Sequence, residues 1–157
     1  MMQLYIKQRV FAWGDKYDVY DASGAAKYYV ESELFTFGHQ IHVYEKRTGR
    51  EVGFVSEQLF TWLKCFDITM SGREVGTVRR KFTFFIPEYE VDFMGWDVEG
   101  DFMHWDYAAY RRGQCVLSIS KEFFTWGDAY TLDFPDPADE IPALLLAIAI
   151  HAANCDH

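Results

Sequence analysis

Apolar and polar residues alternate along most of the chain, in short stretches with a period of two. In one stretch Tyr17 and Val19 fall on one side, while Lys16 and Asp18 fall on the other. Similar stretches cover residues 40–44, 65–70, 88–93 and 128–134. Successive side chains of a β-strand point to opposite faces, so this period is typical of strands. The pattern predicts a mainly β protein with about twelve short antiparallel strands, arranged as a closed barrel.

Glycine-containing pairs separate many of these stretches. They are Ser23-Gly24, Thr48-Gly49, Ser71-Gly72 and Arg112-Gly113. Glycine adopts the positive φ angles that tight hairpin turns require. No linker rich in proline or glycine divides the chain, so the sequence predicts a single domain over residues 1–157.

The pattern changes near the C-terminus, where residues 141–150 are apolar on every side apart from Pro142. Asp136 is a candidate helix cap, and Pro137 suits a first helical turn. We expect a helix over residues 138–154, with Pro142 either kinking the first turn or marking the start of the helix. The apolar run is shorter than the roughly 20 residues that span a bilayer. A helix that is apolar all round must be buried, and the barrel interior is the obvious place.

Aromatic runs recur at fairly regular spacing along the chain. They lie at residues 10–15, 34–39, 59–62, 82–85 and 123–128. We interpret each run as the entry of one hairpin into a shared core. Stacking platforms for bases or sugars are the alternative. Core packing is favoured because no basic residues are interleaved with the aromatic ones.

Composition and charge narrow the function classes. The chain has 157 residues, 50% of them hydrophobic and 18% aromatic, with a formal net charge of −9. An acidic surface disfavours nucleic acids, and also anionic membranes unless a local basic patch overrides it. Cys65, Cys115 and Cys155 are widely spaced, which argues against a disulfide framework or a zinc site. No signal peptide is evident at the start, so we expect a reducing, cytoplasmic setting.

Several segments resemble the LURP-one-related family of the tubby C-terminal-like superfamily. They are residues 3–8 (QLYIKQ), 33–38 (ELFTFG), 96–101 (WDVEGD), 119–128 (ISKEFFTWGD) and 133–156. The resemblance covers essentially the whole chain and implies a twelve-stranded barrel around a central hydrophobic helix. It implies little about activity: plant relatives are linked to pathogen defence, and the wider superfamily includes phosphoinositide-binding tubby proteins and phospholipid scramblases.

The histidines give weak catalytic signals. His39 and His42 are three residues apart on a strand and so point to opposite faces, which makes them a poor chelating pair. His104 and Asp106 share a face and are a candidate acid–base pair, although an ordinary surface pair explains them better. His151 lies near the end of the apolar helix, where a structural role is favoured. Neither a Gly-x-Ser-x-Gly motif nor a phosphate-binding glycine loop is present.

Acidic residues line the faces of two predicted strands. They are Glu88, Glu90 and Asp92 on one strand and Asp97 and Glu99 on the next. Carboxylate pairs serve glycoside hydrolysis, and carboxylates also bind hard cations weakly. Charges that face solvent explain them better, so we predict no metal, no cofactor and no catalytic residue.

One basic cluster, Arg79, Arg80 and Lys81, precedes the aromatic run at residues 82–85. It is a candidate site for an anionic lipid headgroup. On a strand, however, Arg79 and Lys81 face one way and Arg80 the other, and pairing with nearby acids is the plain alternative.

Three functional hypotheses follow from these features. The first is a non-enzymatic binding or scaffold domain with a protein partner. The second is a peripheral module for phosphoinositides or other anionic phospholipids that uses the basic cluster, and the third is a hydrolase. None of them involves nucleic acid or a membrane-spanning segment.

Overall fold

The computed structural model describes residues 2–7, 16–35, 38–85, 88–102, 104–124 and 127–154. The strands are β1 (Met2–Lys7), β2 (Lys16–Asp21), β3 (Ala26–Phe35), β4 (Gly38–Glu45), β5 (Glu51–Glu57), β6 (Cys65–Met70), β7 (Arg73–Lys81), β8 (Glu88–Phe93), β9 (Asp97–Asp101), β10 (Asp106–Arg111), β11 (Gln114–Phe124) and β12 (Gly127–Phe134). The short helix η2 (Pro137–Asp139) and the helix α1 (Glu140–Asn154) follow the last strand.

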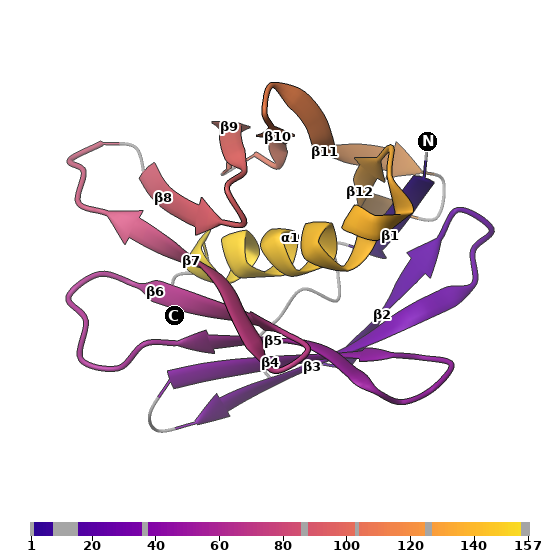
Figure 1. Ribbon diagram of the computed structural model, residues 1–157, viewed down its shortest axis with the longest axis horizontal. Coiled ribbons are helices and arrows are strands. Elements are labelled where there is room, and N and C mark those ends of the chain that lie inside the picture. The colour runs from indigo at the N-terminus through magenta and orange to yellow at the C-terminus, as the bar shows by residue number, and fades with distance from the viewer. Residues whose placement is uncertain are drawn as a thin grey trace.

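All twelve strands form one antiparallel sheet that curves around α1 (Figure 1). The strand order is β8-β7-β6-β5-β4-β3-β2-β1-β12-β11-β10-β9. Because β1 pairs with β12, the sheet wraps into a barrel, and the predicted barrel architecture is confirmed. The barrel is nearly closed rather than fully closed, since β8 and β9 stand at the two ends of the strand order.

The strands follow the predicted alternation of buried and exposed positions. On β2, Tyr17 and Val19 are buried while Lys16 is exposed. The glycine turns also form where the sequence places them. Ser71 and Gly72 both have positive φ angles (52° and 79°), a combination that matches the right-handed twist of a hairpin.

The helix α1 fills the barrel. Leu144, Leu146 and Ile150 have almost no exposed surface, and the helix contacts β5, β6 and β7 on one side and β11 and β12 on another. Asp136 caps η2 by accepting a hydrogen bond from the Ala138 amide at 2.9 Å. Because α1 begins at Glu140, Pro142 lies in its first turn, where a helix needs no amide donor. The helix therefore starts two residues before the proline, close to but not at the start that one of the two predicted outcomes gave.

Two buried carboxylates anchor the start of α1 to the sheet. Asp139 accepts two hydrogen bonds from the Arg111 guanidinium, at 3.0 and 3.3 Å. Glu140 lies 2.7 Å from Lys27 Nζ and accepts a hydrogen bond from the Tyr28 hydroxyl. Burial and this hydrogen bond raise the pKa of Tyr28, so it stays protonated. The negative charges also lie at the positive end of the helix dipole.

Side chains connect the edges of β8 and β9 where the backbone does not. The Tyr89 hydroxyl of β8 donates a hydrogen bond to Asn154 Oδ1, at the end of α1. Asn154 Nδ2 in turn donates to the carbonyl of Phe102, just after β9, at 2.7 Å. The Tyr89 and Phe102 rings meet edge to face with centroids 5.6 Å apart. The last turn of α1 thus holds the two edge strands together.

Candidate functional site

Two neighbouring loops expose large aromatic side chains at one end of the barrel. The exposed fraction is 99% for Phe60 and 83% for Trp62 in the β5–β6 loop, and 84% for Phe84 and 97% for Phe85 after β7. Leu59 and Phe82 are about half exposed. We call these six residues the aromatic end. Both loops project on the left side of Figure 1.

Ring contacts join the two loops into one surface. The Trp62 and Phe82 rings stack with centroids 5.4 Å apart, and Phe82 meets Phe84 edge to face at 5.0 Å. Phe60 has a φ angle of +60°, which is unfavourable for a residue with a bulky side chain. The chain therefore tolerates backbone strain at the same position where it exposes an entire phenyl ring. Strain of this kind concentrates at functional sites.

The prediction that the aromatic runs belong to the core is wrong for residues 59–62 and 82–85. These rings lie in the loops that follow β5 and β7, and they meet solvent. The side chains of the runs around Phe11, Phe35 and Phe124 lie outside the described residues.

The predicted basic cluster leads directly into the aromatic end. Arg79 and Lys81 are exposed on β7, while Arg80 is half-buried on the opposite face. The strand register places Arg79 opposite Glu90 and Lys81 opposite Glu88 on β8. Opposite charges at paired positions attract one another, so these two cations lie beside carboxylates.

Backbone hydrogen bonds fix the roots of the two loops. The Arg80 amide donates to the carbonyl of Lys64 at 2.8 Å, and the Gln58 amide donates to the carbonyl of Cys65 at 2.8 Å. A fourth cation, Lys64, thus stands at the base of the aromatic end. Burial raises the pKa of the Cys65 thiol, and a hydrogen bond from Arg79 partly offsets that rise.

Comparisons with known proteins identify the family of the chain. A family model described as LURP-one-related matches residues 2–151. The chain belongs to the LURP-one-related family. The uncharacterised protein YxjI of Bacillus subtilis (strain 168) is 25% identical over 150 residues, covering 96% of this chain and 92% of that protein. A protein from Arabidopsis thaliana solved by X-ray crystallography has a TM-score of 0.62 at 14% identity, covering 94% of this chain and 88% of that one.

These findings confirm the resemblance seen in the sequence. The plant structure shares the overall fold of this chain. In the described residues of this LURP-one-related chain, no helix is long and apolar enough to cross a membrane.

The histidines occupy separate positions in this LURP-one-related barrel. His104 Nδ1 lies 2.6 Å from Asp101, not beside the predicted partner Asp106, and both members of that pair are largely exposed. His151 lies against the Trp105 ring, with centroids 5.3 Å apart. The His104–Asp101 pair is poorly suited to acid–base catalysis, because its two side chains are exposed to solvent and do not lie in a desolvated site.

His39 and His42 point to opposite faces of β4, as their spacing predicts. His39 is buried with its Nδ1 3.0 Å from Glu57. His42 faces outward, 3.0 Å from Glu51 and 3.6 Å from Glu33. Within the described part of the chain, no three His, Cys, Asp or Glu side chains are placed to hold a metal ion.

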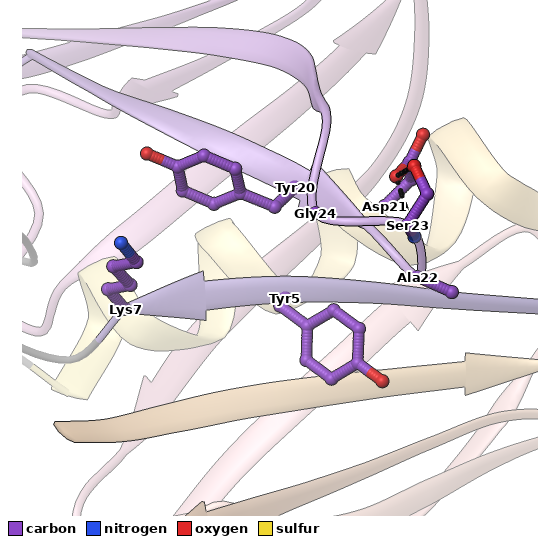
Figure 2. Close-up of a pocket in the computed structure, with 7 residues that line it drawn as sticks. All are labelled: Tyr5, Lys7, Tyr20, Asp21, Ala22, Ser23 and Gly24. Atoms are coloured by element: carbon purple, nitrogen blue, oxygen red, sulfur yellow. Dashed lines mark hydrogen bonds between the residues drawn. The ribbon is translucent and has the colours of Figure 1, made fainter. Parts of the chain in front are cut away.

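A cleft of about 470 Å³ opens on the outer surface where β1 and β2 part, after only two paired positions. It is lined by Tyr5, Lys7, Tyr20, Asp21, Ala22, Ser23 and Gly24. Figure 2 shows Lys7 reaching toward Tyr20, with Asp21 and Ser23 together at the other end. Lys7 Nζ lies 4.9 Å from the centre of the Tyr20 ring.

The polar groups of this cleft serve the local structure. Asp21 accepts hydrogen bonds from the Ser23 hydroxyl at 2.6 Å and from the Ala25 amide at 3.1 Å. These bonds, the Ser23 hydroxyl first, lower the pKa of Asp21. The carboxylate is therefore occupied in shaping the β2–β3 turn. The aromatic end remains the surface whose exposure the fold itself does not explain.

Proposed function

We propose that this protein is a non-enzymatic binding module that docks on anionic membranes through its aromatic end. The observation that carries the proposal is the nearly complete exposure of Phe60, Trp62, Phe84 and Phe85 on two adjoining loops. Burying a large apolar side chain is favourable by roughly 1.5–3 kcal/mol. A protein that leaves four such rings in water gains that free energy only when something else covers them.

The form of this surface favours a membrane. The rings stand on loop tips, so they can enter the interfacial layer of a bilayer, where aromatic side chains are favoured, without any change in the barrel. Lys64, Arg79, Arg80 and Lys81 lie at the roots of the same loops and supply cations at headgroup depth. The net charge of −9 repels the rest of the molecule from an anionic surface, which orients the aromatic end toward it.

The filled barrel supports a role on the outer surface. Residues of α1 such as Leu145 and Ala149 are fully buried, so the helix occupies the space in which other barrels hold a ligand. A protein partner that covers the same rings is the second candidate, because exposed aromatic clusters also mark protein interfaces. Hydrolysis has less support, because His104 and Asp101 form an exposed surface pair.

Co-sedimentation with vesicles tests the proposal. The purified protein is mixed with phosphatidylcholine vesicles, with and without 30% phosphatidylserine or a few per cent phosphoinositide, at two salt concentrations. We expect binding to the anionic vesicles, a loss of at least tenfold in the Phe60→Ser/Phe85→Ser variant, and weaker, less salt-sensitive binding in the Arg79→Ala/Arg80→Ala/Lys81→Ala variant.

The Met94→Ser variant is the matched control, because Met94 is an exposed apolar residue away from the aromatic end. It should bind as the unmodified protein does. Absence of binding to every vesicle, or equal binding by the Phe60→Ser/Phe85→Ser variant, would overturn the membrane proposal. Capture of a single protein by the aromatic end, lost in the same variant, would support the second candidate.

A further inference from the structure

The strands β8 and β9 begin as a hairpin and then separate. Met94 and Gly95 have φ angles of 52° and 71°, and the Trp96 amide donates to the carbonyl of Phe93 at 2.8 Å, which closes a hairpin turn. Such turns normally lead into paired strands. Here no pairing follows, and Figure 1 shows the two strands diverging from the turn.

A buried tryptophan follows the turn. Trp96 is only 4% exposed, and its ring meets Phe93 edge to face at 5.2 Å. Each edge strand keeps one side of its backbone outside the sheet. Among the described strands, β8 pairs only with β7, and β9 only with β10.

The two faces of β8 indicate which side chains a strand paired with its free edge should carry. Outward positions Glu88 and Glu90 are exposed and acidic, whereas Tyr89 is buried and Val91 half-buried. The strand on the other side of β8 already shows a complementary pattern. In β7, Arg79 and Lys81 lie opposite the outward glutamates, and Val78 lies opposite Val91.

We propose that the free edge of β8 accepts an extended peptide in which basic and apolar residues alternate, and that the peptide adds as a further strand. Backbone hydrogen bonds to the edge provide affinity in this mode, and alternate side chains provide specificity. The basic residues would meet Glu88 and Glu90, and the apolar ones would lie beside Val91. A second copy of β8 suits the edge poorly, because the same glutamates would face each other.

Side-chain contacts, and not backbone pairing, hold the two edge strands together. Tyr89, Phe102 and Asn154 join them on the inner side of the sheet, through side chains. An added strand would use the backbone edge of β8, with its basic side chains outward beside Glu88 and Glu90 and its apolar side chains inward beside Val91. The proposal therefore does not depend on the aromatic end, and the two can fail separately.

The probe is a synthetic peptide with the sequence of β7, REVGTVRRK, because that strand already pairs with β8. Binding of a labelled peptide to the full chain is measured by fluorescence anisotropy, and amide hydrogen exchange locates the site. We expect a saturable Kd, new protection on β8 amides, and at least tenfold weaker binding for the peptide in which the residue corresponding to Val78 is proline. Proline removes a backbone donor, whereas the basic charges of the peptide are unchanged.

Charge-reversal variants provide the second arm. Glu88→Lys/Glu90→Lys should weaken binding at least tenfold, whereas Glu51→Lys/Glu74→Lys, which changes the net charge equally on other strands, should change it less than twofold. Equal binding by the proline peptide would mean attraction by charge alone and would overturn strand addition. Protection that appears away from β8, or no binding of the peptide at millimolar concentration, would also overturn the proposal.

Discussion

The β9–β10 connection and the β7–β8 loop both carry aromatic residues, yet these residues have opposite surroundings. Trp105, in the first connection, is 6% exposed and stacks on Tyr130 with centroids 4.0 Å apart. Phe84 and Phe85, in the second, stand in solvent. Phe102 and Tyr89 are in ring contact between the two regions.

The comparison separates what stabilises the fold from what remains available for binding. The barrel is able to cover aromatic loop residues, because it does so for Trp105 against His151 and the last turn of α1. The exposure of Trp62 and its neighbours is therefore a property of those loops and not a consequence of the architecture. Burial of Trp105 contributes to folding, whereas the aromatic end contributes little until a partner covers it.

The largest effect should come from removing α1, against which Trp105 packs. Truncation after Pro135 deletes α1, whose roughly ten buried apolar residues each contribute about 1.5–3 kcal/mol, more than the stability of a typical domain. We expect the shortened chain to be unfolded in circular dichroism and amide NMR spectra. A soluble truncation with a cooperative urea transition would show that the barrel is stable without its helix.

The next largest effect compares one tryptophan from each region. Trp105→Ala should lower the free energy of unfolding by about 3–5 kcal/mol, because it empties a buried site. Trp62→Ala should change it by less than about 0.5 kcal/mol, because that ring is already in solvent. Urea unfolding followed by far-ultraviolet circular dichroism measures both. Similar losses in the two variants would mean that the aromatic end is part of the folding core.

The sequence predicts the fold well because its main signals are local. Period-two alternation places the strands, and pairs such as Arg112-Gly113 place the turns, since each depends only on nearby residues. The apolar character of residues 141–150 predicts a buried helix without knowledge of what surrounds it. The candidate lipid residues Arg79, Arg80 and Lys81 also occupy the predicted faces of their strand.

The sequence predicts the aromatic end and the edge strands poorly, because both depend on tertiary contacts. Hydrophobicity alone does not distinguish an aromatic residue that begins a strand from one that lies in the loop after a strand. Trp62 is of the second kind. The local turn signal at residues 93–96 also does not reveal that β8 and β9 part after the turn. Similarly, the local sequence around Asp139 does not reveal its ion-pair partner Arg111, which lies on β10.

A smaller effect should follow from removing the side-chain link between the end of α1 and the two edge strands. Asn154→Ala removes the acceptor of the Tyr89 hydroxyl and the donor to the Phe102 carbonyl, which should cost about 1–3 kcal/mol. Amide exchange should accelerate on β8 and β9 before it does on β3 and β4, because only the edge strands lose a link. Uniform acceleration over all strands would indicate that Asn154 stabilises the helix end alone.

The smallest expected effect concerns Tyr107, a buried residue whose ring centroid lies 5.2 Å from that of Phe102. Its buried hydroxyl has no hydrogen-bond partner among the described residues, so Tyr107→Phe should raise the free energy of unfolding at neutral pH by about 1 kcal/mol. Burial also raises the pKa of Tyr107 well above its usual value. The protonated form is therefore the one that the folded state favours.

That pKa shift sets the direction of the pH dependence. Stability linked to a raised pKa is fully present below the unfolded value of about 10 and is lost as pH rises above it, because the unfolded chain releases the proton first. The advantage of Tyr107→Phe over the unmodified protein should therefore grow between about pH 9 and pH 11, as measured by urea unfolding. Tyr110→Phe, at a half-buried position on the same strand, is the control and should show a smaller change. If the advantage of Tyr107→Phe stayed constant with pH, the Tyr107 hydroxyl would have access to water. The side chains around Phe102 would then be packed less tightly than those around Trp105.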